Sequence, residues 1–480
     1  MKRLLILQQL LAFSTCAFAA EIAVPGDFPT IQAGIDAAKP GDLVLVAPGR
    51  YLEQITLRER VSVSSASSAS SASSASSASS ASSASSASSA KPDLEKGKLG
   101  LKRAEAVIID AGGKSPAVLM AADSSLEGVT VTGAGKFDQA EFDKHYATRG
   151  ENLRDEQGAT GVDGAAPAVQ IDDVTATVAN CIVHDNGNPG IGVSGEGNRS
   201  MITGCVVYRN MGGGIGFANG AEGEASDNTC FQNLRAGIGC RKSKPKIARN
   251  RCYDNVRAGI GIREGSTPLV LENECYENRR AGIGNRMKDT APEIRGNKCY
   301  RNGMAGIGTR NEAAPLIIEN ECYENRLAGI GAMANAKPTI VKNKIYGNQA
   351  AAIGLDACES GVAVIQENEI TASTLVAIGM KAGWTVTVEK NQIKREGGMP
   401  PLVMVFEGAK ADFSKNTFTG SGVAAIRSQG EIKVNGNVFK CPSPRKGGPP
   451  QFAVWALAGS KVDYGDDNQV EGWREALVGP

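Results

Sequence analysis

The sequence predicts an all-β fold, a single-stranded right-handed parallel β-helix with about 23 residues per coil and a short N-terminal capping helix. The first observation is a recurring phrase, which reads RAGIGCR, RAGIGIR, RAGIGNR, MAGIGTR and LAGIGAM. The second is its period, because the central isoleucines are 22 to 25 residues apart and no helical heptad repeats at that distance. These isoleucines are Ile191, Ile215, Ile238, Ile260, Ile283, Ile307, Ile330, Ile353 and Ile378.

The third observation is the pattern inside each repeat, which predicts three short strands. Apolar residues alternate over runs such as AGIGIR, PLVLEN and ECYEN, and Gly, Pro and Asn separate these runs. A single coil cannot bury its apolar side, whereas coils stacked about 4.8 Å apart pair each backbone group with the coils above and below. The column of isoleucines is therefore expected to face the interior.

Two columns of asparagine are expected to form hydrogen-bonded ladders along the stack. In-register coils place like residues on like residues, so the side-chain amides can bond to each other. Asn also tolerates the left-handed backbone of a sharp turn, which gives both columns a structural role. The first column is Asn250, Asn273, Asn297, Asn320 and Asn343, and the second is Asn255, Asn278, Asn302, Asn325 and Asn348.

Seven cysteines are expected to form one further column, two residues after the Asn turn. Ile345 and Ile370 take the same place in later coils, which indicates an inward position. Parallel stacked side chains give poor disulfide torsions, so a stack of buried thiols is favoured over disulfides or metal ligation. The cysteines are Cys181, Cys205, Cys230, Cys252, Cys275, Cys299 and Cys322.

The first twenty residues have the pattern of a Sec-type signal peptide. Lys2 and Arg3 precede an apolar run, and the AFA triplet at 17–19 predicts cleavage near Ala19 or Ala20. We therefore expect a secreted or periplasmic protein. No later run of about 20 apolar residues is present, so no transmembrane segment is expected.

Composition divides the remaining chain into a solenoid with two insertions. Residues 21–63 are assigned to an N-terminal cap and first coil, and the Ser-Ser-Ala repeats at 64–90 to a flexible loop, because their side chains bury little apolar area. Residues 91–440 are assigned to the β-helix, and 441–480 to a C-terminal cap. The polar insertion at 135–166 is interpreted as a lid, a cleft wall or an ordinary loop.

Two stretches resemble known families. FPTIQAGIDAAKPGDLVLVAPGRYLEQI resembles the amino-terminal cap of the pectin-lyase-like superfamily, especially of pectinesterases, which implies a short helix at about 30–38 and a strand at 43–46. The later repeats are similar to the parallel β-helix repeats of the NosD-like and carbohydrate-binding-and-sugar-hydrolysis families. The chain lacks pectinesterase-type active-site segments and a polygalacturonase-like pair of aspartates, so the resemblance implies a fold and neither of these activities.

The overall charge argues against a nucleic-acid partner. Without Lys2 and Arg3 of the signal, 50 Lys and Arg stand against 51 Asp and Glu. A nearly neutral chain lacks the basic surface of general nucleic-acid binders. The sequence makes no prediction about the oligomeric state.

Two outward columns of arginine are the main candidate binding feature. Because the isoleucine faces inward, alternation sends the arginines and glycines of each AGIG strand outward. The columns lie six residues apart, roughly 20 Å at about 3.3 Å per residue, and they are expected to wall a shallow trough with a glycine floor. The arginines are Arg235, Arg257 and Arg280 in one column and Arg241, Arg263, Arg286 and Arg310 in the other, and the glycines are Gly237, Gly259, Gly282, Gly306, Gly239, Gly261, Gly284 and Gly308.

Stacked like charges require compensation, and two sources are considered. An extended anionic polymer would supply carboxylates or sulfates, which suit bidentate contacts with arginine. Alternatively, Glu264, Asp289 and Glu312 neutralise the columns locally, as on an ordinary solvated surface.

An aromatic column follows the inward cysteines and is also expected to face outward. Exposed rings in a row offer faces on which sugars can stack. They can equally pack on one another or beneath a tail. The candidate sugar contacts are Tyr253, Tyr276, Tyr300 and Tyr323, and the column also contains Phe231 and Tyr346.

Catalytic residues are harder to find. The two histidines, His145 and His184, together with Asp163 and Asp185, are the candidates for a small active site, and Asp356 falls at the end of the second arginine column. Their spacing matches no diagnostic motif. No cofactor or metal is expected, and Ca²⁺ enters only if the protein is a lyase.

These features favour an exported β-helix that binds an extended, anionic polysaccharide along its Arg and Gly face. A polysaccharide lyase or hydrolase with a site near the 135–166 insertion is the enzymatic alternative. A structural or adhesive surface protein without a site is the third interpretation.

Overall fold

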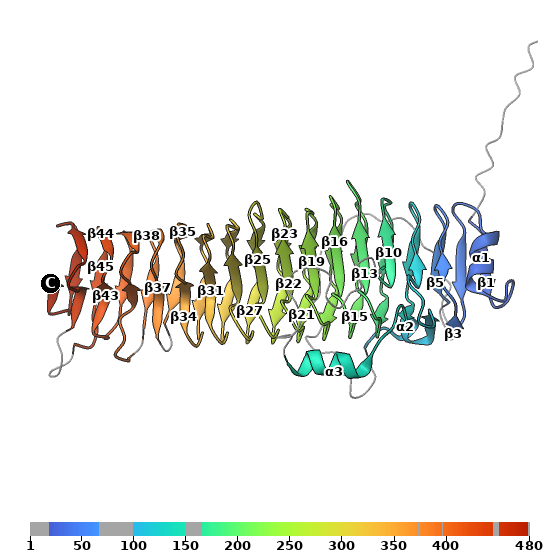
Figure 1. Cartoon of the computed structure of the whole chain (residues 1–480), viewed down its shortest axis with the longest axis horizontal. Helices are drawn as coiled ribbons and strands as arrows, with labels where there is room; N and C mark the ends of the chain where they lie inside the picture. Colours follow the sequence, from blue (N-terminus) through green and yellow to red (C-terminus); the bar gives the residue numbers. More distant parts are fainter. Residues whose placement is uncertain are drawn as a thin grey trace, which may run out of the picture.

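The computed structural model describes residues 19–66, 99–148, 166–372, 375–395, 397–444 and 451–478. These residues form a parallel β-solenoid, drawn lengthwise in Figure 1. Three parallel sheets run along it, and successive coils add one strand to each sheet. Within the described residues, no helix is long and apolar enough to cross a membrane.

The first sheet has 17 strands, each joined in register to the corresponding strand of the next coil. Its strands are β1 (Glu21–Val24), β2 (Leu43–Val46), β5 (Ser62–Ser65), β8 (Ser125–Glu127), β11 (Thr177–Ala179), β14 (Met201–Thr203), β17 (Glu224–Ser226), β20 (Lys246–Ala248), β23 (Leu269–Leu271), β26 (Glu293–Arg295), β29 (Leu316–Ile318), β32 (Thr339–Val341), β35 (Gly361–Gln366), β38 (Trp384–Glu389), β41 (Lys410–Ser414), β44 (Glu431–Asn435) and β47 (Lys461–Tyr464).

The second sheet has 16 strands and follows the first after a short turn in most coils. Its strands are β3 (Gly49–Leu52), β6 (Val107–Asp110), β9 (Thr130–Thr132), β12 (Ile182–His184), β15 (Val206–Tyr208), β18 (Thr229–Phe231), β21 (Arg251–Tyr253), β24 (Glu274–Tyr276), β27 (Lys298–Tyr300), β30 (Glu321–Tyr323), β33 (Lys344–Tyr346), β36 (Glu369–Thr371), β39 (Gln392–Lys394), β42 (Thr417–Thr419), β45 (Val438–Lys440) and β48 (Gln469–Glu471).

The third sheet also has 16 strands and contains the repeated Ile-Gly segment. Its strands are β4 (Ile55–Thr56), β7 (Val118–Leu119), β10 (Val169–Asp172), β13 (Ile191–Ser194), β16 (Ile215–Ala218), β19 (Ile238–Arg241), β22 (Ile260–Arg263), β25 (Ile283–Arg286), β28 (Ile307–Arg310), β31 (Ala328–Met333), β34 (Ala351–Leu355), β37 (Val376–Met380), β40 (Val403–Val405), β43 (Ala424–Ser428), β46 (Phe452–Ala456) and β49 (Glu475–Val478). The predicted fold class, with three strands per coil, is confirmed.

Three helices accompany the sheets: α1 (Ile31–Ala37), α2 (Lys102–Ala106) and α3 (Gln139–Ala147). Thr30 caps α1 by accepting a 3.1 Å hydrogen bond from the backbone N–H of Ala33. Ile31 and Ile35 are fully buried, so α1 closes the N-terminal end of the core, as predicted. Figure 1 shows α1 at the end of the stack, opposite the C-terminus.

The ends of two predicted segments differ from the sequence interpretation. Ser64 and Ser65, assigned to the Ser-Ser-Ala loop, complete β5 and are buried, because β5 pairs with β2 and β8. Ala66 follows the strand, and residues 67–90 of the tract lie outside the described residues. The predicted C-terminal cap contains a further coil, since β46 pairs with β43 and β47 with β44.

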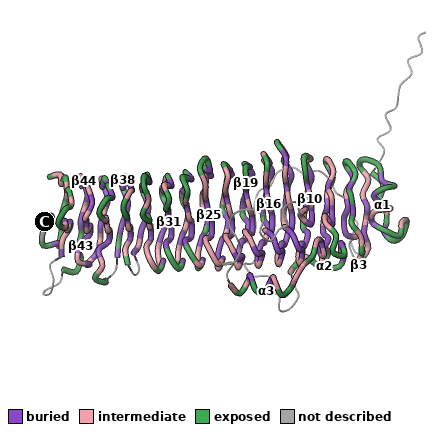
Figure 2. The backbone as a smooth tube through the Cα atoms, viewed as in Figure 1, coloured by how far each residue is buried: buried purple, intermediate pink, exposed green. Residues whose placement is uncertain are grey.

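The interior is one continuous apolar core along the axis, and Figure 2 shows buried residues along the whole stack of coils. The isoleucine column lies in it as predicted, and Ile260, Ile283 and Ile307 have no exposed surface. Their strands are in register, Ile260 beside Ile283 and Ile283 beside Ile307. The repeat period thus places one large apolar side chain above another through the whole stack.

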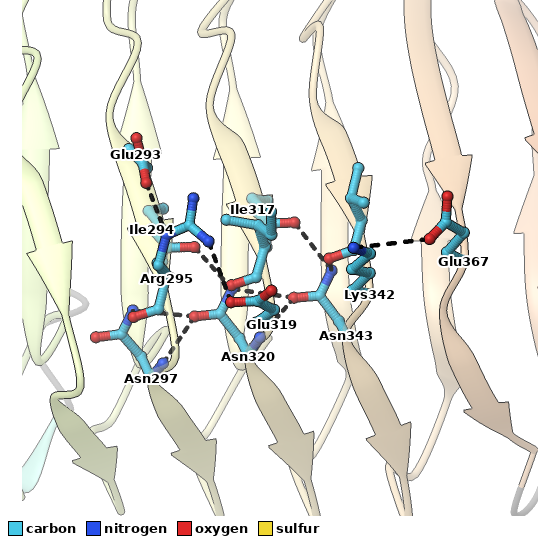
Figure 3. A network of polar contacts seen from close by, with 12 residues as sticks. Glu293, Ile294, Arg295, Asn297, Ile317, Glu319, Asn320, Lys342, Asn343 and Glu367 are labelled. Atoms are coloured by element: carbon cyan, nitrogen blue, oxygen red, sulfur yellow. Dashed lines mark hydrogen bonds and ion pairs between the residues drawn. The ribbon is translucent and has the colours of Figure 1, made fainter.

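The two asparagine ladders are confirmed and are longer than predicted. In the first, Asn297 Oδ1 accepts 2.9 Å hydrogen bonds from the backbone N–H and the side-chain amide of Asn273. The same contacts continue to Asn320 and Asn343, as Figure 3 shows. The ladders comprise Asn228, Asn250, Asn273, Asn297, Asn320, Asn343, Asn368, Asn391, Asn416, Asn437 and Asn468, and Asn186, Asn210, Asn233, Asn255, Asn278, Asn302, Asn325 and Asn348.

The predicted left-handed backbone at the ladder asparagines is wrong. The residue before each ladder asparagine except Asn468 adopts it, for example Glu272 with φ 52° and Glu319 with φ 58°. That residue reverses the chain with its side chain outward, so the following Asn can point its amide into the turn. Arg295 lies two residues before Asn297 and pairs with Glu293 and Glu319 on the outer side of this turn (Figure 3).

The predicted cysteine column is buried, but its seven members occupy two positions. Cys230, Cys252, Cys275, Cys299 and Cys322 lie in register on the second sheet. Val207, not Cys205, pairs with Cys230, and the N–H of Cys205 donates to Asn228 Oδ1 as a ladder asparagine would. The reason is that Cys181 follows Asn180 directly, whereas Cys252 follows Asn250 by two residues. Cys181 and Cys205 therefore occupy, in the first coils of the column, the position that asparagine occupies in the later coils.

These thiols are expected to resist alkylation in the folded protein. All seven cysteines of the predicted column are fully buried, and burial with the bonds from Cys252 and Cys299 raises the pKa of Cys275 well above its usual value. Because a reagent cannot reach a buried thiol, native protein should react slowly at pH 8, and unreduced denatured protein should titrate most cysteines as free thiols. Mass spectrometry that finds neighbouring cysteines oxidised in fresh native protein would contradict this expectation.

Candidate functional site

The outer face of the third sheet carries the second arginine column in register. In β19, β22, β25 and β28 the isoleucine points inward, the glycine after it outward, and the terminal arginine outward. In the parallel register, Arg241 stands beside Arg263, Arg263 beside Arg286, and Arg286 beside Arg310. The prediction of this column is confirmed, and the coil spacing of about 4.8 Å stacks four guanidinium groups along one edge.

A floor without large side chains runs beside this column. A Cβ added to Gly284 would lie 3.7 Å from the Cβ of Ala258, and one added to Gly354 would lie 3.6 Å from the Cβ of Ala328. We call this surface the trough. Its floor consists of Gly216, Gly239, Gly261, Gly284, Gly308, Gly331, Gly354 and Gly379 with Ala236, Ala258, Ala281, Ala305, Ala328 and Ala351.

Both ends of the trough are closed by larger residues. At Gly192, one coil before the floor begins, an added Cβ would lie 2.6 Å from the ring of Pro167. At the other end Met404 stands in register with Gly379. The trough therefore has a defined length of eight coils, set by the run of outward glycines from Gly216 to Gly379.

The other predicted glycine column is not part of the floor. Gly259 is buried at the corner between the second and third sheets, where a Cβ would lie 2.8 Å from the carbonyl oxygen of Gly282 and 2.9 Å from Nδ2 of Asn278. Tight packing against the second asparagine ladder therefore requires glycine here. The same holds for Gly237, Gly282 and Gly306.

The first arginine column is also displaced from its predicted place. Arg235, Arg257 and Arg280 lie in the turn that leads from the second sheet to the third, before the four-residue strands begin. The expected width of 20 Å is therefore wrong, because the six residues do not form one extended strand. These arginines are partly exposed and stack by backbone hydrogen bonds from Arg257 to Arg235 and from Arg280 to Arg257.

Local acids compensate part of the arginine charge. Oε2 of Glu264 lies 2.6 Å from Nε of Arg241, and its Oε1 lies 3.5 Å from Nε of Arg263. One carboxylate thus serves two of the four stacked arginines. Both arginine side chains stay partly exposed, 56% and 30%, so exposed ion pairs of this kind contribute little stability.

The aromatic column does not offer ring faces to a ligand. Neighbouring rings stack almost parallel, with centroids 4.8 Å apart for Tyr300 and Tyr323 and 5.0 Å apart for Tyr276 and Tyr300. Tyr253, Tyr276, Tyr300 and Tyr323 each have a ring on both sides, so the predicted stacking on sugars is wrong and the alternative of mutual packing holds. The stack is His184, Tyr208, Phe231, Tyr253, Tyr276, Tyr300, Tyr323 and Tyr346.

Burial raises the pKa of hydroxyls in this stack. It raises the pKa of Tyr276 to about 12, and the pKa of Tyr208 to about 12. The hydroxyl of Tyr300 donates a 2.7 Å hydrogen bond to Glu274, and Arg251 donates one of 3.1 Å to the hydroxyl of Tyr276. The aromatic column is thus a structural element of the second sheet.

Helix α3, which the sequence interpretation missed, docks on the solenoid beside the first arginine column (Figure 1). Phe142 packs with Leu234 and Val256, the residues before Arg235 and Arg257. The signal was present in the sequence, because Asp138 and Glu141 have capping-box spacing, and Asp138 caps the helix through the N–H of Glu141. The described part of the insertion is therefore a docked helix.

Polar contacts reinforce this docking. The hydroxyl of Tyr146 bonds to Asp254, and the guanidinium carbon of Arg279 lies 4.8 Å from the centroid of the Tyr146 ring. Arg279 also lies 3.2 Å from Asp254. Burial and the bond to Asp254 raise the pKa of Tyr146 to about 12.

The histidines and Asp185 belong to structural contacts. His145 is 3% exposed on α3, with Nε2 2.7 Å from Glu141. His184 ends the aromatic stack, and its Nδ1 lies 2.8 Å from Asp185. Burial opposes ionisation of Asp185, but hydrogen bonds from His184 and Arg209 outweigh it and hold the pKa of Asp185 below its usual value.

The remaining catalytic candidates lie apart from these. Asp356 follows β34 in the second arginine column, and its carboxylate is 2.7 Å from Nζ of Lys381 one coil on. That hydrogen bond lowers the pKa of Asp356. Asp163 lies outside the described residues. Among the residues that the structure describes, no group of three or more His, Cys, Asp or Glu is arranged to hold a metal ion.

Comparison with solved structures gives distant likenesses. The A-module of a mannuronan C-5 epimerase from Azotobacter vinelandii is 12% identical with a TM-score of 0.33, over 94% of this chain and 92% of that one. The catalytic unit of a GH87 α-1,3-glucanase from Streptomyces thermodiastaticus is 11% identical with a TM-score of 0.42, over 97% and 71%. A pectate lyase is 12% identical with a TM-score of 0.33, over 76% and 78%. These values carry no argument about activity.

Sequence comparison identifies the family. No curated protein matches the chain. The family described as "right handed beta helix region" matches this chain at residues 159–297, 270–393 and 339–443. Together these ranges extend over more than half of the chain. These residues include the trough, the aromatic stack and both asparagine ladders except Asn468. The chain therefore belongs to the right-handed β-helix family.

Proposed function

We propose that this protein is exported and that it binds an extended acidic polysaccharide along the trough. The observation that carries the proposal is the register of Arg241, Arg263, Arg286 and Arg310 beside an uninterrupted floor of outward glycines. The fold requires the isoleucines and the corner glycines, but it requires neither of these outward features.

The chemistry of the two features is complementary. A guanidinium presents a fork of N–H donors that matches a carboxylate or sulfate in bidentate geometry. Outward glycines let a polymer backbone approach the sheet closely, and the repeat of about 4.8 Å per coil presents successive arginines along one line. A linear polyanion parallel to the axis would thus meet one cation per coil.

Catalysis has weaker support than binding. His145, His184 and Asp185 are engaged in the docking of α3 and in the aromatic stack, and Asp356 is paired with Lys381. A glycosidase needs two carboxyl groups on either side of one bond, and a lyase needs a positioned base. We therefore propose a binding protein.

Replacing Arg241, Arg263, Arg286 and Arg310 together with glutamine should weaken binding of polygalacturonate by on the order of a thousandfold. Each charge-assisted contact contributes about 1 kcal/mol, and about 1.4 kcal/mol corresponds to a factor of ten. Isothermal titration at low salt measures this loss. Binding by the unchanged protein should also fall as salt is added, because charges more than about 10 Å apart are screened at 0.1 M.

The matched control removes four arginines from other places on the solenoid: Arg199, Arg249, Arg295 and Arg301, which all form exposed ion pairs. It has the same net charge as the trough variant, so general electrostatic attraction is equal in the two. Equal affinity of the two variants would refute the assignment of the trough. Absence of binding by the unchanged protein to uronate and sulfated polymers at low salt would refute the proposed function.

A further inference from the structure

The two arginine columns flank the floor of the trough, since Arg257 precedes Ala258 and Arg263 follows Gly261 by two residues, and we call the columns its rims. Their chemistry changes one coil apart, at Met304 in the first column and at Met333 in the second. In the first column Met304 follows Arg280, and Leu327 follows Met304, through backbone hydrogen bonds from each coil to the one before. In the second column Met333 stands in register with Arg310. The arginine-lined coils therefore give way to coils lined by methionine and leucine.

The apolar side chains of these coils are unusually exposed. Met304, Leu327, Met333, Leu375 and Met399 are 45%, 49%, 43%, 56% and 49% exposed. Among the described residues, they account for five of the eleven large apolar side chains that are exposed. Soluble proteins seldom gather such residues on one surface unless something binds there.

The floor continues without a break across this change. Gly308, Gly331, Gly354 and Gly379 remain in register, and an added Cβ on Gly331 would lie 3.5 Å from the Cβ of Ala305. Beyond them Met404 closes the trough. One continuous surface thus has a cationic half and an apolar half, and a ligand lying along it would meet both.

The apolar half is not uniform. On its second rim, Asp356 and Lys381 follow Met333, but they form an ion pair of 2.7 Å with each other. On its first rim, Met304, Leu327, Ala350 and Leu375 succeed one another without a charged residue. The apolar surface is therefore concentrated on the first rim.

We propose that the ligand of the trough is an acylated acidic glycan, whose carboxylates contact the arginines and whose alkyl chain lies along the methionine and leucine rim. This rests on the proposed function and specifies its substrate class. Four coil spacings separate Met304 from the coil of Met399, roughly 19 Å at about 4.8 Å each, enough for a long extended alkyl chain.

The side chains favour an alkyl chain over other apolar ligands. Sugar faces are recognised by stacking on aromatic rings, whereas this rim contains methionine, leucine and alanine. Methionine is flexible and polarisable, so it adapts to a smooth chain. A recessed Gly and Ala floor between two rims suits a single chain along the axis.

The experiment compares two soluble probes by isothermal titration: tetragalacturonate, and tetragalacturonate carrying one myristoyl chain, kept below its critical micelle concentration. The acylated probe should bind at least about tenfold more tightly, because burial of two methylene groups is sufficient for that factor. Leu327→Ser, Met333→Ser and Leu375→Ser combined should reduce this gain to about twofold or less, while leaving the affinity for the free tetrasaccharide unchanged.

The matched control carries Met201→Ser, Leu269→Ser and Val362→Ser, which replace exposed apolar residues of the first sheet, and it should keep the full gain. Thermal melts establish that both variants are folded. Equal affinity for the two probes, or a gain that survives the trough substitutions, would overturn the inference. Another outcome is that the free tetrasaccharide never binds, while the acylated probe binds the unchanged protein and not the variant with Leu327→Ser, Met333→Ser and Leu375→Ser. That result would support the apolar site and refute the proposed function.

A membrane surface is tested in the same series. Vesicles of phosphatidylglycerol and phosphatidylcholine should bind the unchanged protein and the variant with Leu327→Ser, Met333→Ser and Leu375→Ser equally. Vesicle binding that the trough substitutions abolish, without any gain for the soluble acylated probe, would show that the apolar rim contacts a lipid surface, and it would overturn the assignment of an acylated glycan.

Discussion

Ile283→Asp is expected to unfold the middle of the solenoid. Ile283 has no exposed surface and lies between Ile260 and Ile307, so a carboxylate there would be buried without a partner. Burial of an unpaired charge in a close-packed core is among the few changes that cost about 4 kcal/mol or more. Because each coil contacts only its neighbours, the damage should be greatest at β25 and decrease along the stack in both directions.

Hydrogen–deuterium exchange resolved by peptide measures this directly. Strands β22, β25 and β28 should lose protection first, while β10 and β43 keep it longer. Leu269→Asp is the matched control, because Leu269 is 37% exposed on β23, where a carboxylate stays hydrated. Protection at β25 that equals that of the unchanged protein would contradict the inward assignment of the isoleucine column.

Asn297→Leu is expected to be nearly as severe, although the side chains are similar in size. Oδ1 of Asn297 accepts from the backbone and side chain of Asn273, and its Nδ2 donates to the carbonyl of Val270 at 3.0 Å. Leucine would leave a buried N–H of Asn273 and a buried carbonyl of Val270 without partners. Each such group costs about 1–3 kcal/mol, so the total destabilisation should be about 4 kcal/mol.

Urea unfolding followed by circular dichroism gives the change in free energy. Gln392→Leu provides the control, because it removes a side-chain amide from an exposed position on β39. That substitution should change the free energy of unfolding by less than about 0.5 kcal/mol. If Asn297→Leu were equally mild, the ladders would be a consequence of the fold and would not contribute to its stability.

Much of the candidate site follows from the sequence. Alternation around Ile260 correctly predicts that Gly261 and Arg263 face outward, because neighbouring side chains of a strand point to opposite faces. The repeat also predicts that Arg263 and Arg286 stack. The transition from arginine to methionine and leucine along the rims was equally present in the sequence, as the residues that follow Arg280 and Arg310 in their columns.

Other parts of the site could not be predicted in this way. Arg257 and Gly259 belong to the turn before β22, where the rule of alternation does not hold, so their predicted place on one extended strand is wrong. Arg257 is partly exposed there, but Gly259 is buried. The docking of α3 depends on contacts such as Tyr146 with Asp254, residues 108 positions apart. No repeat relates these two residues, and only the folded chain brings them together.

The sequence by itself therefore determined the coil, the inward isoleucines, the asparagine ladders and the outward arginines of the third sheet. All of these depend on a local period and on stacking of identical units. Only the tertiary structure decided that Cys205 begins an asparagine column, that the tyrosine rings cover one another, and where α3 docks. The physical reason is that turn lengths set the register between coils, and side chains choose between solvent and a neighbour only once that neighbour is in place.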